Sequence, residues 1–160
     1  MDDPISVGLG ESVVSKKTGD VLVAYGLGSC VAVSMYDPSE KLCGLLHAVL
    51  PQEAAGAEVK TKFVDSGISE LLSSMERAGA SRAHIIVRIA GGANMITSPG
   101  FSKSFDIGTR NVDAAHKTLE KLKLPLKGED VGGHTGRTVR FFVDTGRLTV
   151  RMIGGAEMNL

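Results

Sequence analysis

Residues 26–50 read GLGSCVAVSMYDPSEKLCGLLHAVL, and this stretch decides how the chain folds. A glycine-framed turn ends at Cys30, and two apolar runs typical of strands follow it, Val31–Tyr36 and Leu42–Val49. The turn-forming sequence DPSEK separates the two runs. Two such runs joined by a short polar turn predict an antiparallel β-hairpin with Cys30 at its entrance.

The expected register of this hairpin places a cysteine beside a histidine. If Tyr36 pairs with Lys41 across a four-residue loop, Cys30 lies directly opposite His47. Opposed residues of an antiparallel pair point to the same face, with Cβ atoms about 5 Å apart. An imidazole at that distance can take the thiol proton. A slip of one residue would turn His47 to the other face of the hairpin.

A thiol, a base and a glycine-rich turn are the parts of a nucleophilic hydrolase. The thiolate is the attacking form, the imidazole moves the proton, and N–H groups of a turn such as Gly28-Ser29 can face a developing oxyanion. The alternative is structural, because an unpaired cysteine in an apolar setting is usually a small core residue. Cys43 fits that alternative, since it has no glycine turn beside it and faces Ser34 in the same register.

Length, charge and composition indicate one globular domain over residues 1–160. A chain of this length can bury a core of its own. Lys plus Arg and Asp plus Glu number 18 each, so no basic surface for nucleic acid or membranes is expected. No apolar run approaches the roughly 20 residues of a membrane helix, and the start, MDDP, lacks the basic residues of a signal peptide. Two unpaired cysteines then favour a cytoplasmic location.

The rest of the chain predicts a mixture of α and β structure. Apolar residues at helical spacing predict helices over Lys60–Ala78 and from about Thr109 to Leu122. Residues 96–105 have the composition of a loop. Further strands are predicted at Val21–Tyr25, His84–Ala90, Thr138–Val143 and Leu148–Ile153, the last two as a hairpin.

Three other features are weaker candidates for sites. GGAN at residues 91–94 lacks the spacing of a phosphate-binding loop, so a tight strand exit is favoured. The four histidines are scattered without a ligand pair, so neither a metal nor a cofactor is expected. Residues 130–134 with Gly136 and Arg137 fit either a pocket rim or a turn that leads into the last hairpin.

Taken together, several motifs resemble the CheD family of chemoreceptor glutamine deamidases. The resemblance covers about residues 5 to 154, and its specificity comes from the combination of motifs. The matching segments are GLGSCV at 26–31, His47 with Leu50-Pro51, KFVD at 62–65, GGANM at 91–95, IGTRN at 107–111, DVGG at 130–133 and Gly136-Arg137.

The resemblance implies a fold and an activity. The fold would be an α/β layered sandwich of mixed β-sheet and helices, similar to the catalytic domain of cytotoxic necrotizing factor toxins. The activity would be hydrolysis of particular glutamine side chains on methyl-accepting chemotaxis receptors, giving glutamate and ammonia. Cys30 matches the family nucleophile and His47 the general base, with a thioester intermediate. In some species the family also binds a CheC-type phosphatase.

One position departs from the family pattern. The family usually has a threonine six residues before the cysteine, and this chain has Ala24 there. Alanine cannot orient an imidazole, so a backbone carbonyl or a water would have to hold His47. The departure keeps open a second interpretation, a non-catalytic adaptor that binds receptors or a CheC-type phosphatase.

Overall fold

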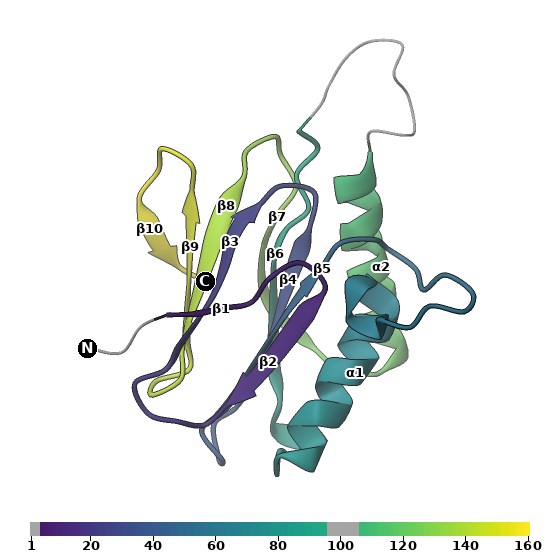
Figure 1. Ribbon diagram of the computed structural model, residues 1–160. Helices are drawn as coiled ribbons and strands as arrows, with labels where there is room; N and C mark the ends of the chain where they lie inside the picture. The colour runs from purple at the N-terminus through teal and green to yellow at the C-terminus, as the bar shows by residue number, and fades with distance from the viewer. Residues whose placement is uncertain (1–3, 96–105) are drawn as a thin grey trace, which may run out of the picture.

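The computed structural model describes residues 4–95 and 106–160 as three stacked layers (Figure 1). Two five-stranded sheets lie face to face, and two helices cover the outer face of the second sheet. Sheet A has the order β1 (Ile5–Ser6), β3 (Val21–Leu27), β8 (Arg137–Phe142), β9 (Arg147–Met152) and β10 (Glu157–Asn159). Sheet B has the order β2 (Glu11–Ser15), β5 (Leu42–Ala48), β4 (Val31–Asp37), β6 (Ile86–Gly91) and β7 (Leu126–Val131). The expected mixed α/β layered sandwich is confirmed.

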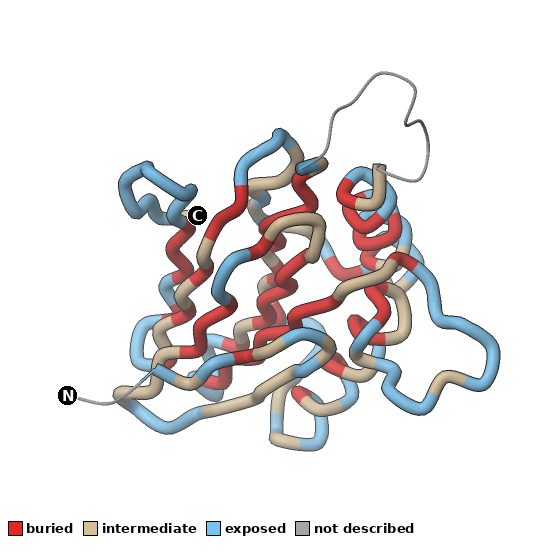
Figure 2. The backbone as a smooth tube through the Cα atoms, turned by 45° about the horizontal axis from the view of Figure 1, so that its top comes forward, coloured by how far each residue is buried: buried red, intermediate tan, exposed pale blue. Residues whose placement is uncertain are grey.

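Strand β4 lies at the centre of sheet B and is covered on both faces. Its odd-numbered residues, Val31, Val33 and Met35, pack with the apolar faces of the two helices. Ala32 belongs to a second cluster, between the two sheets. Alternate residues of a strand point to opposite faces, so one strand serves both cores. Figure 2 shows the resulting run of buried backbone through the middle of the molecule.

Both predicted helices are present, with changed boundaries. Helix α1 (Val64–Arg77) buries residues at helical spacing, among them Ile68, Leu71 and Met75. The expected start at Lys60 is wrong, because Phe63 is extended and separates α1 from a short 3-10 helix, η1 (Lys60–Lys62). Helix α2 covers Ile107–Lys121. A second short 3-10 helix, η2 (Arg82–His84), precedes β6.

The hairpin forms, but its register differs from the expected one. Asp37 pairs with Leu42, so the four-residue loop is 38–41 and Ala32, not Cys30, lies directly opposite His47. The residue opposite His47 thus lies two positions further along β4 than expected. Because side chains alternate with a period of two, His47 keeps the face that was predicted for it.

A buried carboxylate explains the register. Asp37 is fully buried, and its Oδ1 accepts the N–H groups of Ser39 at 2.9 Å and Glu40 at 3.4 Å. Its Oδ2 accepts the N–H of Ser81 at 2.8 Å. These bonds keep Asp37 at the end of the strand and cap the turn that follows. Cys43 consequently lies opposite Tyr36 and not opposite Ser34, although it is buried as expected.

Four strands, β1, β2, β7 and β10, were not predicted from the sequence. Strands β1 and β10 are only two and three residues long, and β2 and β7 carry polar residues on their outer sides. Strand β7 runs parallel to β6, which places the return from α2 beside the strand that precedes the helix. The expected loop at residues 96–105 lies outside the described residues.

We expect Gly91→Ala to destabilise the protein more than Gly132→Ala. Both glycines have positive φ, 109° and 84°. A Cβ at Gly91 would overlap the carbonyl oxygen of Cys30, whereas a Cβ at Gly132 would meet nothing within 4 Å. Left-handed backbone alone costs about 1–2 kcal/mol, and overpacking adds about 1–3 kcal/mol. Urea unfolding should show that extra loss of about 1–3 kcal/mol in the Gly91→Ala variant. Equal losses would show that the turn at Cys30 moves freely.

Candidate functional site

Cys30 occupies the turn between β3 and β4, directly before the first residue of β4. Its side chain is partly exposed and packs against the cluster between the two sheets. The turn is tied to the end of β6, because the carbonyls of Gly28 and Cys30 accept the N–H groups of Ala93 at 2.9 Å and Gly92 at 2.8 Å. Cys30 therefore lies at one end of the strands of the sandwich, on a turn whose backbone is hydrogen-bonded to β6 and the residues after it.

His47 lies on β5 and is 3% exposed. The segment that crosses from sheet A to sheet B holds it at two points. The carbonyl oxygen of Val7 is 2.9 Å from the ring nitrogen Nδ1, and the N–H of Gly10 donates to the backbone carbonyl of His47 at 2.8 Å. Since a carbonyl only accepts, Nδ1 carries the proton and Nε2 is the free acceptor in the neutral ring.

The environment of His47 favours its neutral form. Burial lowers the pKa of the imidazole, and the bond to Val7 and the charge of Glu11 oppose that shift only in part. Nε2 is buried and has no hydrogen-bond partner among the described residues. A neutral ring with an unpartnered Nε2 can accept a proton from a group that approaches it.

Cys30 lies just before the first paired residue of sheet B, and its side chain packs against the cluster on the face that carries His47. Ala32 lies opposite His47, and Cys30 precedes Ala32 by two residues, which gives a diagonal relation in place of the direct one expected. Diagonal neighbours in an antiparallel pair are about 7–8 Å apart at the backbone and closer at the side chains. Within the described part of the chain, no hydrogen bond joins the two side chains.

The turn offers N–H groups beside the thiol. The carbonyls of Gly28 and Ser29 are bound by Ala93 N–H and by the side-chain amide of Asn111. Across a trans peptide the N–H points opposite to the C=O, so the N–H groups of Ser29 and Cys30 point away from those partners. Among residues 4–95 and 106–160, neither N–H donates to another residue, although the N–H of Cys30 interacts with its own thiol. The sequence predicts Gly28 and Ser29 as the oxyanion turn, and this stays a prediction. The bound carbonyls of Gly28 and Ser29 fix the directions of the N–H groups of Ser29 and Cys30.

The two cysteines differ in accessibility. Burial raises the pKa of the Cys30 thiol, and its own backbone N–H opposes that shift. Burial raises the pKa of Cys43 to about 12, and the side chain is fully covered. Cys30 thus rests as a thiol near neutral pH and needs a base to become a nucleophile, whereas Cys43 is a core residue.

Ala24 is buried in β3, opposite Val139. Ala24 and Ala32 belong to the cluster between the sheets, and Cys30 packs against that cluster. The partner of His47 Nδ1 is instead the carbonyl of Val7, a group that no side-chain motif could reveal.

The segment 130–137 is held by a buried arginine. Arg137 is 1% exposed, and its guanidinium donates to the Asp130 carboxylate at 2.8 Å and to the backbone carbonyls of Asp130, Gly132 and Thr135. Asn94 accepts the N–H of Thr109 near the start of α2, which fits a strand exit and not a phosphate cradle.

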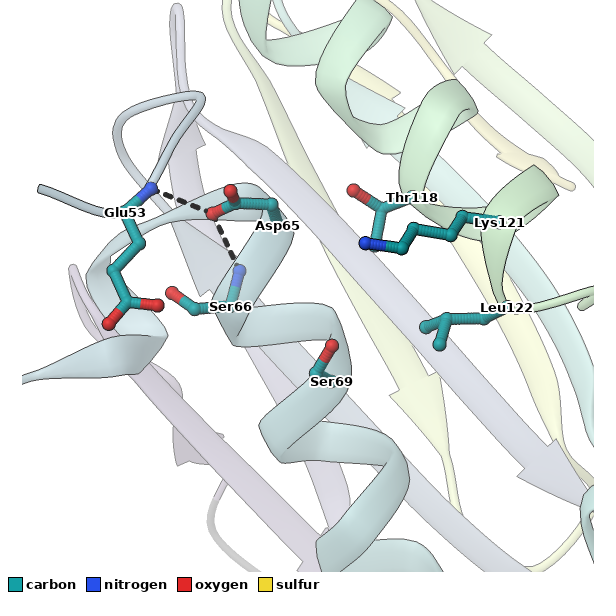
Figure 3. Close-up of a pocket in the computed structure, with 7 residues that line it drawn as sticks. All are labelled: Glu53, Asp65, Ser66, Ser69, Thr118, Lys121 and Leu122. Carbon is teal, nitrogen blue, oxygen red and sulfur yellow. Dashed lines mark hydrogen bonds between the residues drawn. The ribbon is translucent and has the colours of Figure 1, made fainter.

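A separate surface pocket of about 280 Å³ lies between α1 and α2 (Figure 3). The helices cover the face of sheet B opposite to the one that carries His47, so this pocket is distinct from the candidate site. The pocket is lined by Glu53, Asp65, Ser66, Ser69, Thr118, Lys121 and Leu122.

In the described residues, no group of three or more His, Cys, Asp or Glu side chains is placed to hold a metal ion. Nor is any helix there long and apolar enough to cross a membrane.

The fold and the candidate site define a layered α/β protein with a partly exposed thiol and a buried imidazole on its inner strands and their connecting turn. Residues 49–152 match the family described as CheD chemotactic sensory transduction. A Thermotoga maritima protein, "Chemoreceptor glutamine deamidase CheD", is 39% identical, covering 94% of this chain and 93% of its own. A Halalkalibacterium halodurans protein of the same name is 37% identical over the whole of both chains. The chain belongs to the CheD family.

We expect His47 to remain neutral with its proton on Nδ1. Nitrogen-15 NMR should show that tautomer and a pKa below the ordinary value of 6.5, because burial disfavours the charged ring. As pH falls through about 6.5 the unfolded chain takes up a proton first, so stability is lost until the folded pKa is passed. His47→Gln should remove this part of the pH dependence of unfolding. A proton on Nε2, or a pKa above 6.5, would contradict the assignment.

We expect iodoacetamide to label Cys30 at least about tenfold faster than Cys43 in the native protein at pH 7.5, because only Cys30 is both partly exposed and near a base. Peptide mass spectrometry separates the two sites. The same reaction in urea is the control, since both thiols should then label at similar rates. Equal labelling of the native protein would remove Cys30 from consideration as a nucleophile.

Proposed function

We propose that the protein hydrolyses glutamine side chains of methyl-accepting chemotaxis receptors to glutamate and ammonia. One observation carries the proposal. His47 is buried, held at Nδ1 by a carbonyl and open at Nε2, and the partly exposed Cys30 packs against the cluster on the same face of sheet B. The names of the curated relatives supply the substrate, since those proteins are called chemoreceptor glutamine deamidases.

The proposed reaction has two halves. In the first, His47 Nε2 takes the thiol proton, the Cys30 sulfur bonds to the carboxamide carbon, and the oxyanion faces the N–H groups of Ser29 and Cys30. The C–N bond then breaks, and ammonia leaves with the proton from His47. In the second, His47 deprotonates a water that attacks the thioester, which releases glutamate and returns the proton to the sulfur.

The raised pKa of Cys30 suits this order of events. A thiol that rests protonated is protected from adventitious oxidation and needs the imidazole at the moment of attack. His47 has the complementary property, because burial keeps it in the form that accepts a proton. The two shifts together support general-base activation on substrate binding.

The expected setting is the cytoplasmic region of the receptors, with the chain acting as one CheD-like deamidase domain over residues 1–160. A CheC-type phosphatase is the second proposed partner. The rival function, a non-catalytic adaptor, drew its support from Ala24. The Val7 carbonyl weakens that support, because it holds the ring nitrogen that a threonine hydroxyl would otherwise bind.

We expect the protein to convert glutamines of a receptor cytoplasmic fragment, seen as a gain of about 1 Da per site with release of ammonia, the chemistry of an activated thiol. Cys30→Ala should abolish the gain in a folded protein, and Cys43→Ala is the matched control that should leave turnover nearly unchanged. His47→Ala should lower turnover by about 10²- to 10⁴-fold while receptor binding persists.

Normal turnover by folded Cys30→Ala would refute the thiol mechanism. If the unaltered protein binds the fragment tightly yet never changes its mass, the adaptor function is correct instead.

A further inference from the structure

We propose that Asn111 is a positioning residue that aims the N–H of Cys30 at the oxyanion. The inference rests on the proposed function. Asn111 lies on α2 and is fully buried, on a helix face whose other buried residues are apolar or glycine. Its Nδ2 donates to the carbonyl oxygens of Ser29 at 2.8 Å and Val49 at 3.0 Å. The side chain therefore joins the nucleophile turn to the chain that leaves β5.

The orientation of the amide is determined by its partners. Two carbonyl oxygens can be served only by the NH₂ side of the group. Oδ1 is consequently left buried and without a partner among the described residues. An unpaired buried acceptor costs free energy, and an apolar side chain of similar size would avoid that cost. The amide is thus explained by what Nδ2 holds and not by packing.

The bond to Ser29 fixes one peptide plane. Its carbonyl and the N–H of Cys30 belong to the same planar unit and point in opposite directions. A donor that holds the carbonyl toward α2 therefore holds the N–H away from it, on the side of the thiol. The second bond, to Val49, prevents the amide from rotating with the turn. Preorganised donors of this kind act on charge that develops in the transition state.

The test uses two small reagents at Cys30, so it does not need a receptor. With p-nitrophenyl acetate the sulfur bonds to the acetyl carbon, His47 takes the thiol proton and p-nitrophenolate leaves, by way of an oxyanion. Iodoacetamide alkylates the same sulfur with loss of iodide and forms no oxyanion. For Asn111→Leu we expect acylation to fall at least about tenfold while alkylation stays within about threefold.

Two further variants keep the test decisive. Leu119→Ala removes another buried side chain from the same helix. It should lower the melting temperature while both rates stay within about threefold of those of the unaltered protein. Asn111→Ser takes the place of Asn111→Leu if the leucine variant does not fold. Serine is too short to reach both carbonyls, so the same selective fall in acylation is expected. Cys30→Ala measures the background of both reagents.

Unchanged acylation in a folded Asn111 variant would overturn the proposal. A parallel fall of acylation and alkylation would also overturn it, because that pattern describes a general loosening of the turn. The deamidation assay is a separate matter. If the ratio changes as expected while the unaltered protein leaves receptor glutamines intact, the positioning role stands and the proposed function fails.

Discussion

The pairing of β4 with strands on both sides, while both of its faces are covered, is the constraint on which the structure depends. It aligns the helices against one face and sheet A against the other. The residue opposite His47 on this strand is Ala32, which belongs to the cluster between the sheets. The same strand begins directly after Cys30. The packing of β4 in the two cores therefore also determines where the residues of the candidate site lie.

Much of the fold could be predicted from periodicity. The hairpins and both helices follow from long stretches in which apolar residues recur at the spacing of a strand or a helix. The register of the first hairpin did not follow, because it depends on a single carboxylate, Asp37, that binds backbone groups from two separate segments. The short strands β1 and β10 were missed for a related reason. Two or three residues carry no period, and only the neighbouring strand makes them part of a sheet.

The candidate site divides in the same way. Cys30 and His47 were predicted from residue type and spacing, and the Cys30 side chain packs on the side of sheet B that carries His47. The groups that orient them could not be predicted. Val7 lies 40 residues before His47 and contributes only its backbone, while Asn111 lies 82 residues after Ser29 on a helix with an otherwise ordinary amphipathic pattern. Contacts of that range are products of the finished fold, and no local pattern encodes them.

The bond between His47 Nδ1 and the carbonyl of Val7 has a consequence for how the site changes in evolution. A carbonyl is common to all twenty amino acids, so a codon change at position 7 cannot delete it as a codon change deletes a hydroxyl. What must be inherited is the route of the chain from one sheet to the other. Lineages can then exchange a side-chain anchor for a main-chain one, and alanine at position 24 is compatible with such an exchange. Relatives without the threonine should not be discounted on that ground.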